Sequence, residues 1–482
     1  MNVLQVSAEI FPLLKTGGLA DIAGALPGAL QSVGCQVRVV LPGFPAILTD
    51  LTDSCVLAEL TAPWGERLQV RQGRLRTLGL DAYVIDLPHL YDRPGGPYDD
   101  VWRQPYVDNH RRFALLSWVA AQLAQGLDPH WQPRVVHSHD WHAGLTSAYM
   151  AFMPHRSLRV ATVFTVHNLA YQGVFSPACF YELGLPHAAF NMNGVEFYGQ
   201  VSFMKAGLYY ADHITTVSPT YACEIQTSEQ GCGLDGLLRT RSASLSGILN
   251  AVDDAVWNPG ADPLISDHYD AANLAGKARC KASLQKDLGL AVQSDAPLFG
   301  VVSRLTGQKG LHLVLGALDT ILARGGQLVL LGTGEAHLES IFKAKAAQYP
   351  HAVSVRIGYD ESYAHRIFAA TDVTLVPSQF EPCGLTQMYG LKYGSLPLVH
   401  RVGGLADTVV DCSLENMAEG RANGFVFGDF NQQALERAVA RAFALYARQP
   451  EWETVRACGM RQDLGWQNAA HQYLALYQHL CA

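Results

Sequence analysis

Four short segments of this chain combine glycines, cations, acids and histidines in patterns that could bind a phosphate-bearing ligand. They are KTGGLAD (Lys15 to Asp21), VVHSHDWHAG (Val135 to Gly144), SRLTGQKG (Ser303 to Gly310) and PSQFEPCGLTQ (Pro377 to Gln387). Each contains or follows a run of aliphatic and β-branched residues that predicts a strand. Doubly wound α/β proteins bind ligands outside the carboxyl ends of strands, so these segments are the candidate sites.

The first segment predicts an anion-binding loop. Gly17 and Gly18 would let the backbone approach a ligand, the following helix would offer free N–H groups, and Lys15 would add a charge suited to phosphate. An ordinary strand-to-helix turn with a surface lysine is the alternative. The letters GGLAD recur from Gly403 to Asp407, which fits a second strand-to-helix turn.

Two further loops carry charges that phosphate chemistry needs. Arg304 and Lys309 bracket a turn, so both could converge on one diphosphate and stabilise a departing phosphate without a metal. Two solvated cations are the alternative. Glu381 stands between Phe380 and Pro382, an unusual setting for a solvating acid. The GLT that follows would open a helix whose amides could hold phosphate oxygens, and helix capping is the alternative role for Glu381.

The histidine-rich segment admits two interpretations. His137, His139 and His142, with Asp140 nearby, invite a zinc site. Strand alternation would put His137 and His139 on one face. However, no HExxH pattern or cysteine partner accompanies them, so we favour a polar strand end that lines a cleft.

Neighbouring residues offer groups for a sugar. Trp141 could stack on a sugar ring, while His167 and Asn168 end another predicted strand and could face the same space. A merely buried, hydrogen-bonded His167 is the alternative. The chain has no GxSxG, Walker A or well-placed GxGxxG motif, which argues against a serine hydrolase, a P-loop kinase and a dehydrogenase.

Length and composition bound the class of protein. The 482 residues exceed what one hydrophobic core usually spans, so two domains are expected. A net charge of -8 argues against nucleic-acid binding, and ten scattered cysteines without a CxxC pair predict reduced thiols. The start, MNVLQVSAEIFPLLK, lacks a basic leader, and no apolar run approaches the ~18 residues of a membrane helix. We therefore expect a cytoplasmic protein without membrane or nucleic-acid partners.

Short β-branched runs alternate with amphipathic segments along the chain. Examples are VRVVLP and ATVFTVHN in the first half, and QLVLLGTG and VTLVPS in the second. Continuous apolar strands separated by helical stretches predict parallel sheets that are covered on both faces. The expected fold class is α/β, with two Rossmann-like doubly wound domains. The spacing of Trp466, Ala470, Tyr473, Leu474 and Tyr477 predicts a final helix.

Together these motifs resemble those of one family, the bacterial glycogen synthases and plant starch synthases. KTGGLAD, HDWHAG, FTVHNLAYQG, KAGLYYADHITTVSPTYA, SRLTGQKG, FEPCGLTQ and LKYG occur in the family's order and roughly its spacing, over nearly the full length. The resemblance implies a GT-B type fold whose two Rossmann-like domains face a central cleft. Residues 1–250 would form the acceptor side with the Lys15 donor loop, 251–460 would bind the nucleotide sugar, and 461–482 would cross back to the first domain.

The resemblance also implies an activity, the transfer of glucose from ADP-glucose to the non-reducing end of an α-1,4-glucan such as glycogen or a maltooligosaccharide. The configuration would be retained, with no cofactor and no metal. The implied catalytic residues are Glu381, Arg304, Lys309 and His167. The implied donor-binding residues are Lys15, Gly17, Gly18, Asn250, Gln308, Tyr359, Cys383, Gly384, Leu385 and Thr386. The residues implied to face the transferred sugar or the acceptor are Asp21, Asp140, Trp141 and Asn168.

The mechanism of retention depends on whether a second acid is present. A double displacement would need a carboxylate nucleophile beside the anomeric carbon. Some related retaining transferases carry a second glutamate a few residues beyond the Glu381 position, where this chain reads QMYGLKYG with Tyr389 and no acid. We therefore favour front-face attack, in which the departing phosphate accepts the proton of the acceptor and His167 positions the sugar.

Other functions stay open. The same fold could use UDP-glucose or another nucleotide sugar, because donor choice depends on a few base contacts. A phosphorolytic enzyme is disfavoured, because nothing marks a pyridoxal-phosphate lysine. A catalytically inactive glucan- or nucleotide-binding protein is disfavoured, because a decayed site would have lost at least one of its functional residues. All five are present here: Lys15, His167, Arg304, Lys309 and Glu381.

Overall fold

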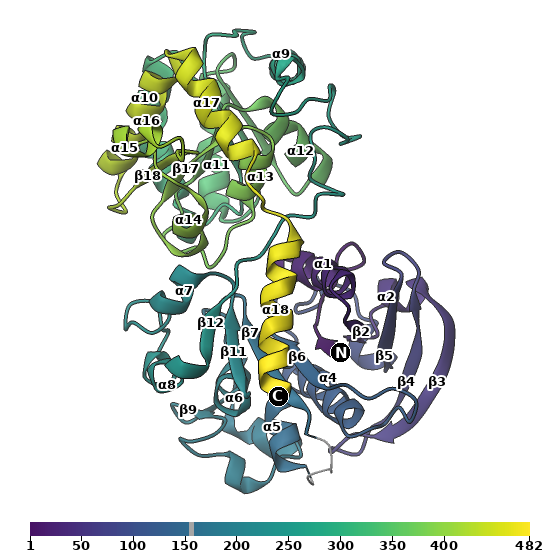
Figure 1. The fold of residues 1–482 in the computed structure, drawn as a ribbon. Coiled ribbons are helices and arrows are strands. Elements are labelled where there is room, and N and C mark those ends of the chain that lie inside the picture. Colours follow the sequence, from purple (N-terminus) through teal and green to yellow (C-terminus); the bar gives the residue numbers. More distant parts are fainter. Residues whose placement is uncertain (154–158) are drawn as a thin grey trace. The chain divides into compact units, whose positions relative to one another are not determined.

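The computed structural model describes residues 1–153 and 159–482, which form two compact units (Figure 1). The first unit contains Met1–Asn250 together with Trp466–Ala482, and the second contains Ala251–Gly465. Each unit is a Rossmann-like doubly wound sheet with helices, so the expected α/β fold class is confirmed.

The sheet of the first unit has the strand order β12-β11-β7-β6-β1-β2-β5-β4-β3. Its strands are β1 Asn2–Val6, β2 Gln36–Pro42, β3 Leu51–Thr61, β4 Arg67–Leu75, β5 Leu80–Asp86, β6 Val135–His139, β7 Ala161–Val166, β11 His213–Thr216 and β12 Leu245–Gly247. Neighbours pair in parallel except at β4, which is antiparallel to β3 and β5. The central strands β6 and β7 are buried throughout, as the largely apolar sequence of β7 predicts, whereas β6 buries the polar residues His137, Ser138 and His139.

Helices and a small second sheet complete the first unit. The helices are α1 Gly18–Ser32, α2 Pro45–Asp50, α3 Pro88–Tyr91, α4 Asn109–Ala124, α5 Leu145–Phe152, α6 Phe203–Tyr210, α7 Pro219–Glu224, α8 Asp235–Thr240 and α18 Trp466–Cys481. Single 3-10 turns cover Trp141–Ala143, Pro177–Glu182, His187–Ala189 and Ser242–Ser244. The small antiparallel sheet contains β8 Val174–Phe175, β10 Gln200–Ser202 and β9 Glu196–Phe197.

The last helix, α18, packs on the first unit beside α1 (Figure 1). Its buried face includes Tyr473 and Tyr477, at the helical spacing that the sequence predicts. The Tyr477 hydroxyl lies 2.7 Å from His137 Nδ1 in the core. The helix begins at Trp466 and not at residue 461, because the preceding residues 461–465 form a turn.

The sheet of the second unit has the strand order β15-β14-β13-β16-β17-β18, with every neighbour parallel. Its strands are β13 Leu298–Val302, β14 Gln327–Gly332, β15 Val353–Ile357, β16 Val373–Val376, β17 Leu396–His400 and β18 Phe425–Phe427. Its helices are α9 Ala275–Asp287, α10 Leu311–Ala323, α11 Ala336–Gln348, α12 Glu361–Ala370, α13 Thr386–Lys392, α14 Gly403–Thr408, α15 Leu414–Ala418, α16 Gln432–Tyr446 and α17 Gln449–Met460, with a 3-10 turn at Gly307–Lys309.

In both sheets the strand order reverses beside the first strand. This switch point lies between β1 and β6 in the first unit and between β13 and β16 in the second. Loops leaving the two strands diverge there, which makes the carboxyl end of the switch point the usual ligand site of such sheets. The four candidate segments contain or follow these four strands, so the topology places each of them at a switch point.

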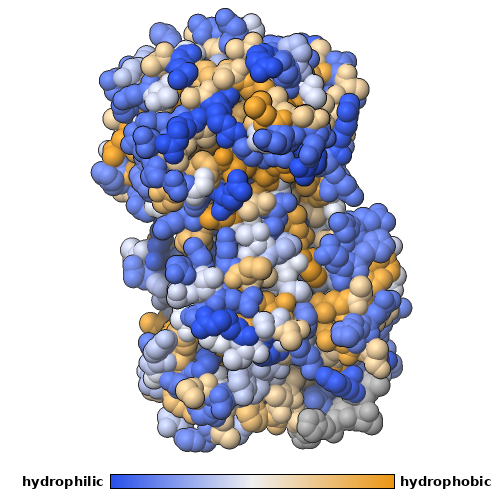
Figure 2. All heavy atoms as spheres, turned by 60° about the vertical axis from the view of Figure 1, so that its left-hand side comes forward, coloured by the Kyte–Doolittle hydropathy of each residue, from blue (hydrophilic) through white to orange (hydrophobic). Residues whose placement is uncertain are grey.

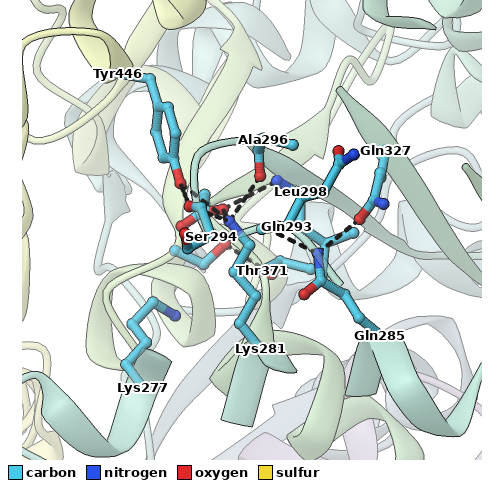
Figure 3. A network of polar contacts seen from close by, with 12 residues as sticks. Lys277, Lys281, Gln285, Gln293, Ser294, Ala296, Leu298, Gln327, Thr371 and Tyr446 are labelled. Atoms are coloured by element: carbon cyan, nitrogen blue, oxygen red, sulfur yellow. Dashed lines mark hydrogen bonds and ion pairs between the residues drawn. The ribbon is translucent and has the colours of Figure 1, made fainter. Parts of the chain in front are cut away.

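The amino-terminal end of the second sheet is closed by a buried polar network (Figure 3). Lys281 on α9 donates to the Ala296 carbonyl at 2.6 Å, to the Asp372 carboxylate at 2.7 Å and to the Tyr446 hydroxyl at 3.0 Å. Asp372 also accepts from the Leu298 backbone N–H at 2.9 Å. A buried ion pair with this many partners holds α9 and α16 against the strand starts, away from the candidate site.

Across residues 1–153 and 159–482, no helix combines the length and the apolarity that crossing a membrane requires. The face drawn in Figure 2 mixes hydrophilic and apolar side chains, with hydrophilic ones over most of it.

Candidate active site

A small pocket lies at the switch point of the second unit, between β13 and β16. The loop after β13 contributes Ser303 and Lys309 to its lining, the loop after β16 contributes Ser378 and Glu381, and α13 contributes Thr386. The structure thus brings Lys309, Glu381 and Thr386, three residues singled out from the sequence, around one space.

An ion pair joins the two loops of this pocket. Lys309 Nζ lies 2.6 Å from Glu381 Oε2, and the Ser378 hydroxyl donates to the same oxygen at 2.8 Å. Glu381 is buried, with 8% of its surface exposed. Because two donors fix one carboxylate oxygen, the acid has a defined orientation. Helix capping does not describe it, since no side chain in the described residues caps α13.

Glycines allow the backbones around Glu381 to approach each other closely. Gly310 has φ 69°, and a Cβ there would lie 2.0 Å from the Pro377 carbonyl oxygen. Gly404, in the second GGLAD, donates its N–H to the Glu381 carbonyl at 3.1 Å. A Cβ at Gly404 would lie 2.1 Å from the Cys383 carbonyl oxygen. The second GGLAD is therefore a packing contact that supports the loop carrying Glu381.

Other predicted donor residues of the second unit lie around the same end of the sheet. Arg304, in the loop after β13, is exposed. Gln308 is half-buried, and its carbonyl accepts a backbone hydrogen bond from Gln379 at 2.8 Å. Tyr359 follows β15 and is 71% exposed, with its hydroxyl bonded to Glu361. The convergence of Arg304 with Lys309 and the role of Tyr359 in donor binding stay predictions.

The predicted GLT helix start is present. Cys383 is buried, Gly384 has φ 73°, and α13 begins at Thr386 with Leu385 at its N-cap. A Cβ at Gly384 would lie 2.4 Å from Gln387 Oε1, so the left-handed turn and the tight packing both favour glycine. The short segment 382–385 separates Glu381 from the amides of this first turn.

At the switch point of the first unit, β1 leads into the KTGG loop. Helix α1 begins at Gly18, and no described side chain caps it at Gly17. A Cβ added at Gly17 or Gly18 would meet no heavy atom of the described chain within 4 Å, so folding does not require glycine at either position. Lys15 Nζ lies 2.9 Å from Asp21. Open space above a helix N-terminus, with a lysine beside it, suits an anionic ligand.

Asp140 locks the loops after β6 and β7 together. Its carboxylate accepts the backbone N–H groups of His167 at 2.8 Å and of Asn168 at 3.4 Å, and its own N–H donates to the Thr165 carbonyl. Its φ of 56° lies in the region that favours glycine. Burial raises the pKa of Asp140 to about 7, although the two N–H groups act in the opposite direction. Such a strained, buried acid is the kind of residue found at functional sites.

The buried His137 and His139 and the half-buried His167 all make hydrogen bonds. His137 Nδ1 pairs with the Tyr477 hydroxyl at 2.7 Å, its Nε2 pairs with the Thr165 hydroxyl at 2.5 Å, and His139 Nδ1 lies 3.0 Å from His167 Nε2. The rings of His137 and His139 are on one face, 4.2 Å apart, as strand alternation predicts. Burial lowers the pKa of His137 and His167 to about 3, so both rings are neutral. Within the described residues no cluster of three or more potential ligands could hold a metal ion.

The remaining predicted residues of the first unit are placed as follows. Trp141 packs against His142, with ring centroids 4.0 Å apart, and a Cβ at Gly173 would lie 2.2 Å from its ring. Its ring therefore has extensive protein contacts, and stacking on a sugar stays a prediction. Asn168 is half-buried, and Asn250, which is buried, is the last residue of the stretch Met1–Asn250 of the first unit.

Sequence reasoning missed three polar residues that the structure places at the switch points. The Ser378 hydroxyl donates a hydrogen bond to the Glu381 carboxylate. The Tyr98 hydroxyl donates one to the Glu9 carboxylate beside the KTGG loop. An acid directly after an apolar strand, as in VLQVSAE, was the available signal for Glu9. Ser378 lies only three residues before Glu381 in the quoted segment PSQFEPCGLTQ, whereas Tyr98 depends on a tertiary contact.

The fold and its polar switch points are those of a GT-B glycosyltransferase. Residues 2–240 match the family model "Starch synthase catalytic domain", and residues 288–453 match "Glycosyl transferases group 1". A glycogen synthase of Variovorax paradoxus (strain S110) is 65% identical over 99% of this chain and 98% of its own. One of Francisella tularensis subsp. novicida is 55% identical over 100% and 99%. The chain belongs to the glycogen synthase and starch synthase family, as its motifs indicated.

Solved structures agree with this assignment. The catalytic domain of starch synthase IV from Arabidopsis thaliana, bound to ADP and acarbose, matches with a TM-score of 0.90 and 33% identity, over 99% of both chains. A sucrose-phosphate synthase from Thermosynechococcus elongatus matches with a TM-score of 0.59 and 17% identity, over 99% of this chain and 98% of its own, and shares the fold.

Proposed function

We propose that this protein is a glycogen synthase that transfers glucose from ADP-glucose to the non-reducing end of an α-1,4-glucan, with retention of configuration. The observation that carries the proposal is the Lys309–Glu381 pair, which lies in a pocket at the switch point of the second sheet. The family to which the chain belongs supports the same function. The family relatives named glycogen synthase, and the starch synthase bound to ADP and acarbose, support a nucleotide-sugar donor and a glucan acceptor.

The second unit would hold the donor. Lys309 and Arg304 would bind the diphosphate, and the amides at the start of α13 would contact its oxygens. Glu381, oriented by Lys309 and Ser378, would accept hydrogen bonds from the glucose hydroxyls. As the phosphate departs, negative charge grows on its oxygens, and fixed cations stabilise that charge. Because side chains supply this charge, the proposed reaction needs no metal and no cofactor.

The chemical step would be a front-face displacement. The bond between the anomeric carbon and the phosphate oxygen breaks, and the acceptor hydroxyl oxygen bonds to that carbon on the same face. The proton of the acceptor hydroxyl passes to the departing phosphate. No covalent glucosyl intermediate forms on a protein carboxylate. His167, held neutral by burial, would position the sugar by hydrogen bonding, and Asp140 would fix the loop that carries His167.

ADP release is the direct test of this function. Purified protein is given ADP-glucose with and without glycogen, beside a matched UDP-glucose reaction, and released nucleotide is measured. Glycogen-dependent ADP release that collapses in Glu381→Ala, but not in the control Glu451→Ala, is expected; Glu451 pairs with Arg448 on the surface of the same unit. Proton NMR of the lengthened chain should show only α-linkages.

Two other outcomes would redirect the assignment. Release of UDP alone would keep the fold and the site but replace the donor. Silence with both donors, combined with glucan or nucleotide binding, would favour an inactive binding protein. The cytoplasm, where nucleotide sugars and glycogen occur, stays the expected location.

A further inference from the structure

A buried acid that the proposed mechanism does not use lies beside the KTGG loop. Glu9 follows β1 and is 2% exposed. Three donors meet its carboxylate: the Thr16 backbone N–H at 2.6 Å, the Thr16 hydroxyl and the Tyr98 hydroxyl. Burying a carboxylate is costly unless hydrogen bonds replace its water, and these three donors supply that replacement.

One side of this arrangement is the loop expected to bind the donor. Thr16 lies between Lys15 and Gly17, so the bonds from Thr16 to Glu9 fix the backbone on which both depend. The Lys15 ammonium also lies 4.9 Å from the centroid of the Phe11 ring. Glu9 therefore holds the loop through Thr16, while the space above Gly17 and Gly18 stays open.

The other side is an aromatic wall, which we define as Tyr98, Trp141 and His142. Tyr98 stacks on His142 with ring centroids 4.5 Å apart and an interplanar angle of 23°. The ring centroids of Trp141 and His142 are 4.0 Å apart. Burial and the charge of Glu9 raise the pKa of Tyr98 well above its usual value, so its hydroxyl stays protonated and donates. The segment carrying Tyr98 is closed by the Arg93–Asp108 pair, with contacts of 2.8 and 2.6 Å.

We propose that Glu9 is a positioning residue that holds the donor loop, Lys15–Gly18, in register with the aromatic wall next to Asp140. The inference rests on the proposed function, because it assigns donor contacts to the loop. Its consequence is that donor binding depends on the Tyr98 hydroxyl through its hydrogen bond to Glu9. The chemistry requires an acceptor-only group, since a backbone N–H and two hydroxyls must all donate.

Substitutions can separate the individual bonds. Glu9→Gln keeps the shape of the side chain but replaces one acceptor oxygen with a donor. Tyr98→Phe and Thr16→Val each remove one hydroxyl, and Thr16→Ser, which keeps the hydroxyl, should restore what Thr16→Val loses. Tyr149→Phe is the matched control, because Tyr149 is a buried tyrosine of the same unit whose hydroxyl donates to the Leu183 carbonyl at 2.6 Å.

The measurement is kcat and KM for ADP-glucose at saturating glycogen, with folding monitored by circular dichroism. Loss of a charge-assisted hydrogen bond predicts a fall in kcat/KM for ADP-glucose of roughly 10- to 100-fold in Glu9→Gln and roughly 10-fold in Tyr98→Phe. Tyr149→Phe should change the thermal midpoint without this kinetic loss. In a Lys15→Ala background, Glu9→Gln should cost only about 2-fold more, because both changes disable the same loop.

Fully additive losses of kcat/KM in the Glu9→Gln, Lys15→Ala double variant would show that Glu9 does not act through the Lys15 loop and would overturn the inference. So would unchanged kcat/KM in Tyr98→Phe and Thr16→Val, which carry the test if Glu9→Gln does not fold. Failure of the proposed function would look different, because the unmodified protein would then release no ADP with glycogen.

Discussion

Lys309 Nζ and Glu381 Oε2 lie 2.6 Å apart, one on the loop after the first strand of the second sheet and the other on the loop after the fourth. The contact spans the switch point, where no strand separates the loops. Both side chains are largely buried, with 18% and 11% of their side-chain surfaces exposed, so solvent screens the pair less than it would at the surface. Each residue therefore helps to fix the position of the other.

The first prediction concerns this pair. Glu381→Ala and Lys309→Ala should each lower glycogen-dependent ADP release on the order of 100-fold or more, because either change removes a contact and leaves a partner charge unpaired. The double variant should lose little more than the worse single variant, since residues that act as a unit give non-additive losses. Steady-state rates of the three variants test this, and strictly multiplicative losses would show that the two residues act independently.

The two GGLAD segments give a second prediction, because the same letters meet different surroundings. A methyl group at Gly18 meets open space, whereas one at Gly404 would lie 2.1 Å from the Cys383 carbonyl oxygen. Gly18→Ala should keep its thermal midpoint and lose about 10-fold or more in kcat/KM for ADP-glucose, because the methyl occupies ligand space. Gly404→Ala should lose about 1–3 kcal/mol of stability. Thermal unfolding and kinetics on both variants test the contrast, and a stability loss at Gly18 alone would contradict it.

Much of this arrangement could be predicted from sequence, and the reason is topological. Apolar runs such as ATVFTV predict buried parallel strands, and parallel strands place the segments that follow them at one edge of the sheet. The family resemblance places Lys309, Glu381 and Thr386 around one donor, and the structure brings all three around one pocket. A hydrogen-bonded residue is also the alternative that the sequence offers for His167, whose Nε2 lies 3.0 Å from His139 Nδ1.

Features that depend on hydrogen-bonding and packing partners distant in the sequence could not be predicted in this way. The φ of 56° at Asp140 is imposed by bonds to the loop after β7, and no local pattern encodes it. The sequence suggests that Trp141 is available to stack on a sugar, but in the structure Gly173 and His142 pack on its ring. The buried carboxylate of Glu9 is stabilised by a hydrogen bond from the Tyr98 hydroxyl, and Tyr98 lies 89 positions away in the sequence.

A third prediction uses the titration of Asp140. Its pKa is raised by burial from 3.8 to about 7, so between these values the folded state binds more protons than the unfolded state, and stability falls as pH rises. Asp140→Asn removes this effect. The variant should match the parent near about pH 4 and exceed it by up to roughly 4 kcal/mol above about pH 7, while losing activity. Denaturant unfolding across this range tests the sign, and a gain that does not vary with pH would refute it.

Metal removal provides a fourth prediction. If Lys309 and Arg304 stabilise the charge on the leaving phosphate, full activity should persist in excess chelator. The measurement is the initial rate of ADP release before and after chelation, with Mg²⁺ added back. Strict loss that the added metal restores would mean that the cations do not suffice.

The final prediction concerns His167. Burial lowers its pKa to about 3, far below the ordinary value of 6.5, so the ring stays neutral across about pH 5 to 8. His167→Gln, which can still donate and accept hydrogen bonds, should lower kcat by about 10- to 100-fold without changing the shape of the pH profile of kcat/KM. Profiles of both proteins test this. A limb near about pH 6.5 in the parent that disappears in the variant would show that His167 exchanges a proton during the reaction. If instead the two profiles have the same shape, the neutral imidazole acts by positioning alone, and the proton of the acceptor must leave by another route, for which the departing phosphate is the available base.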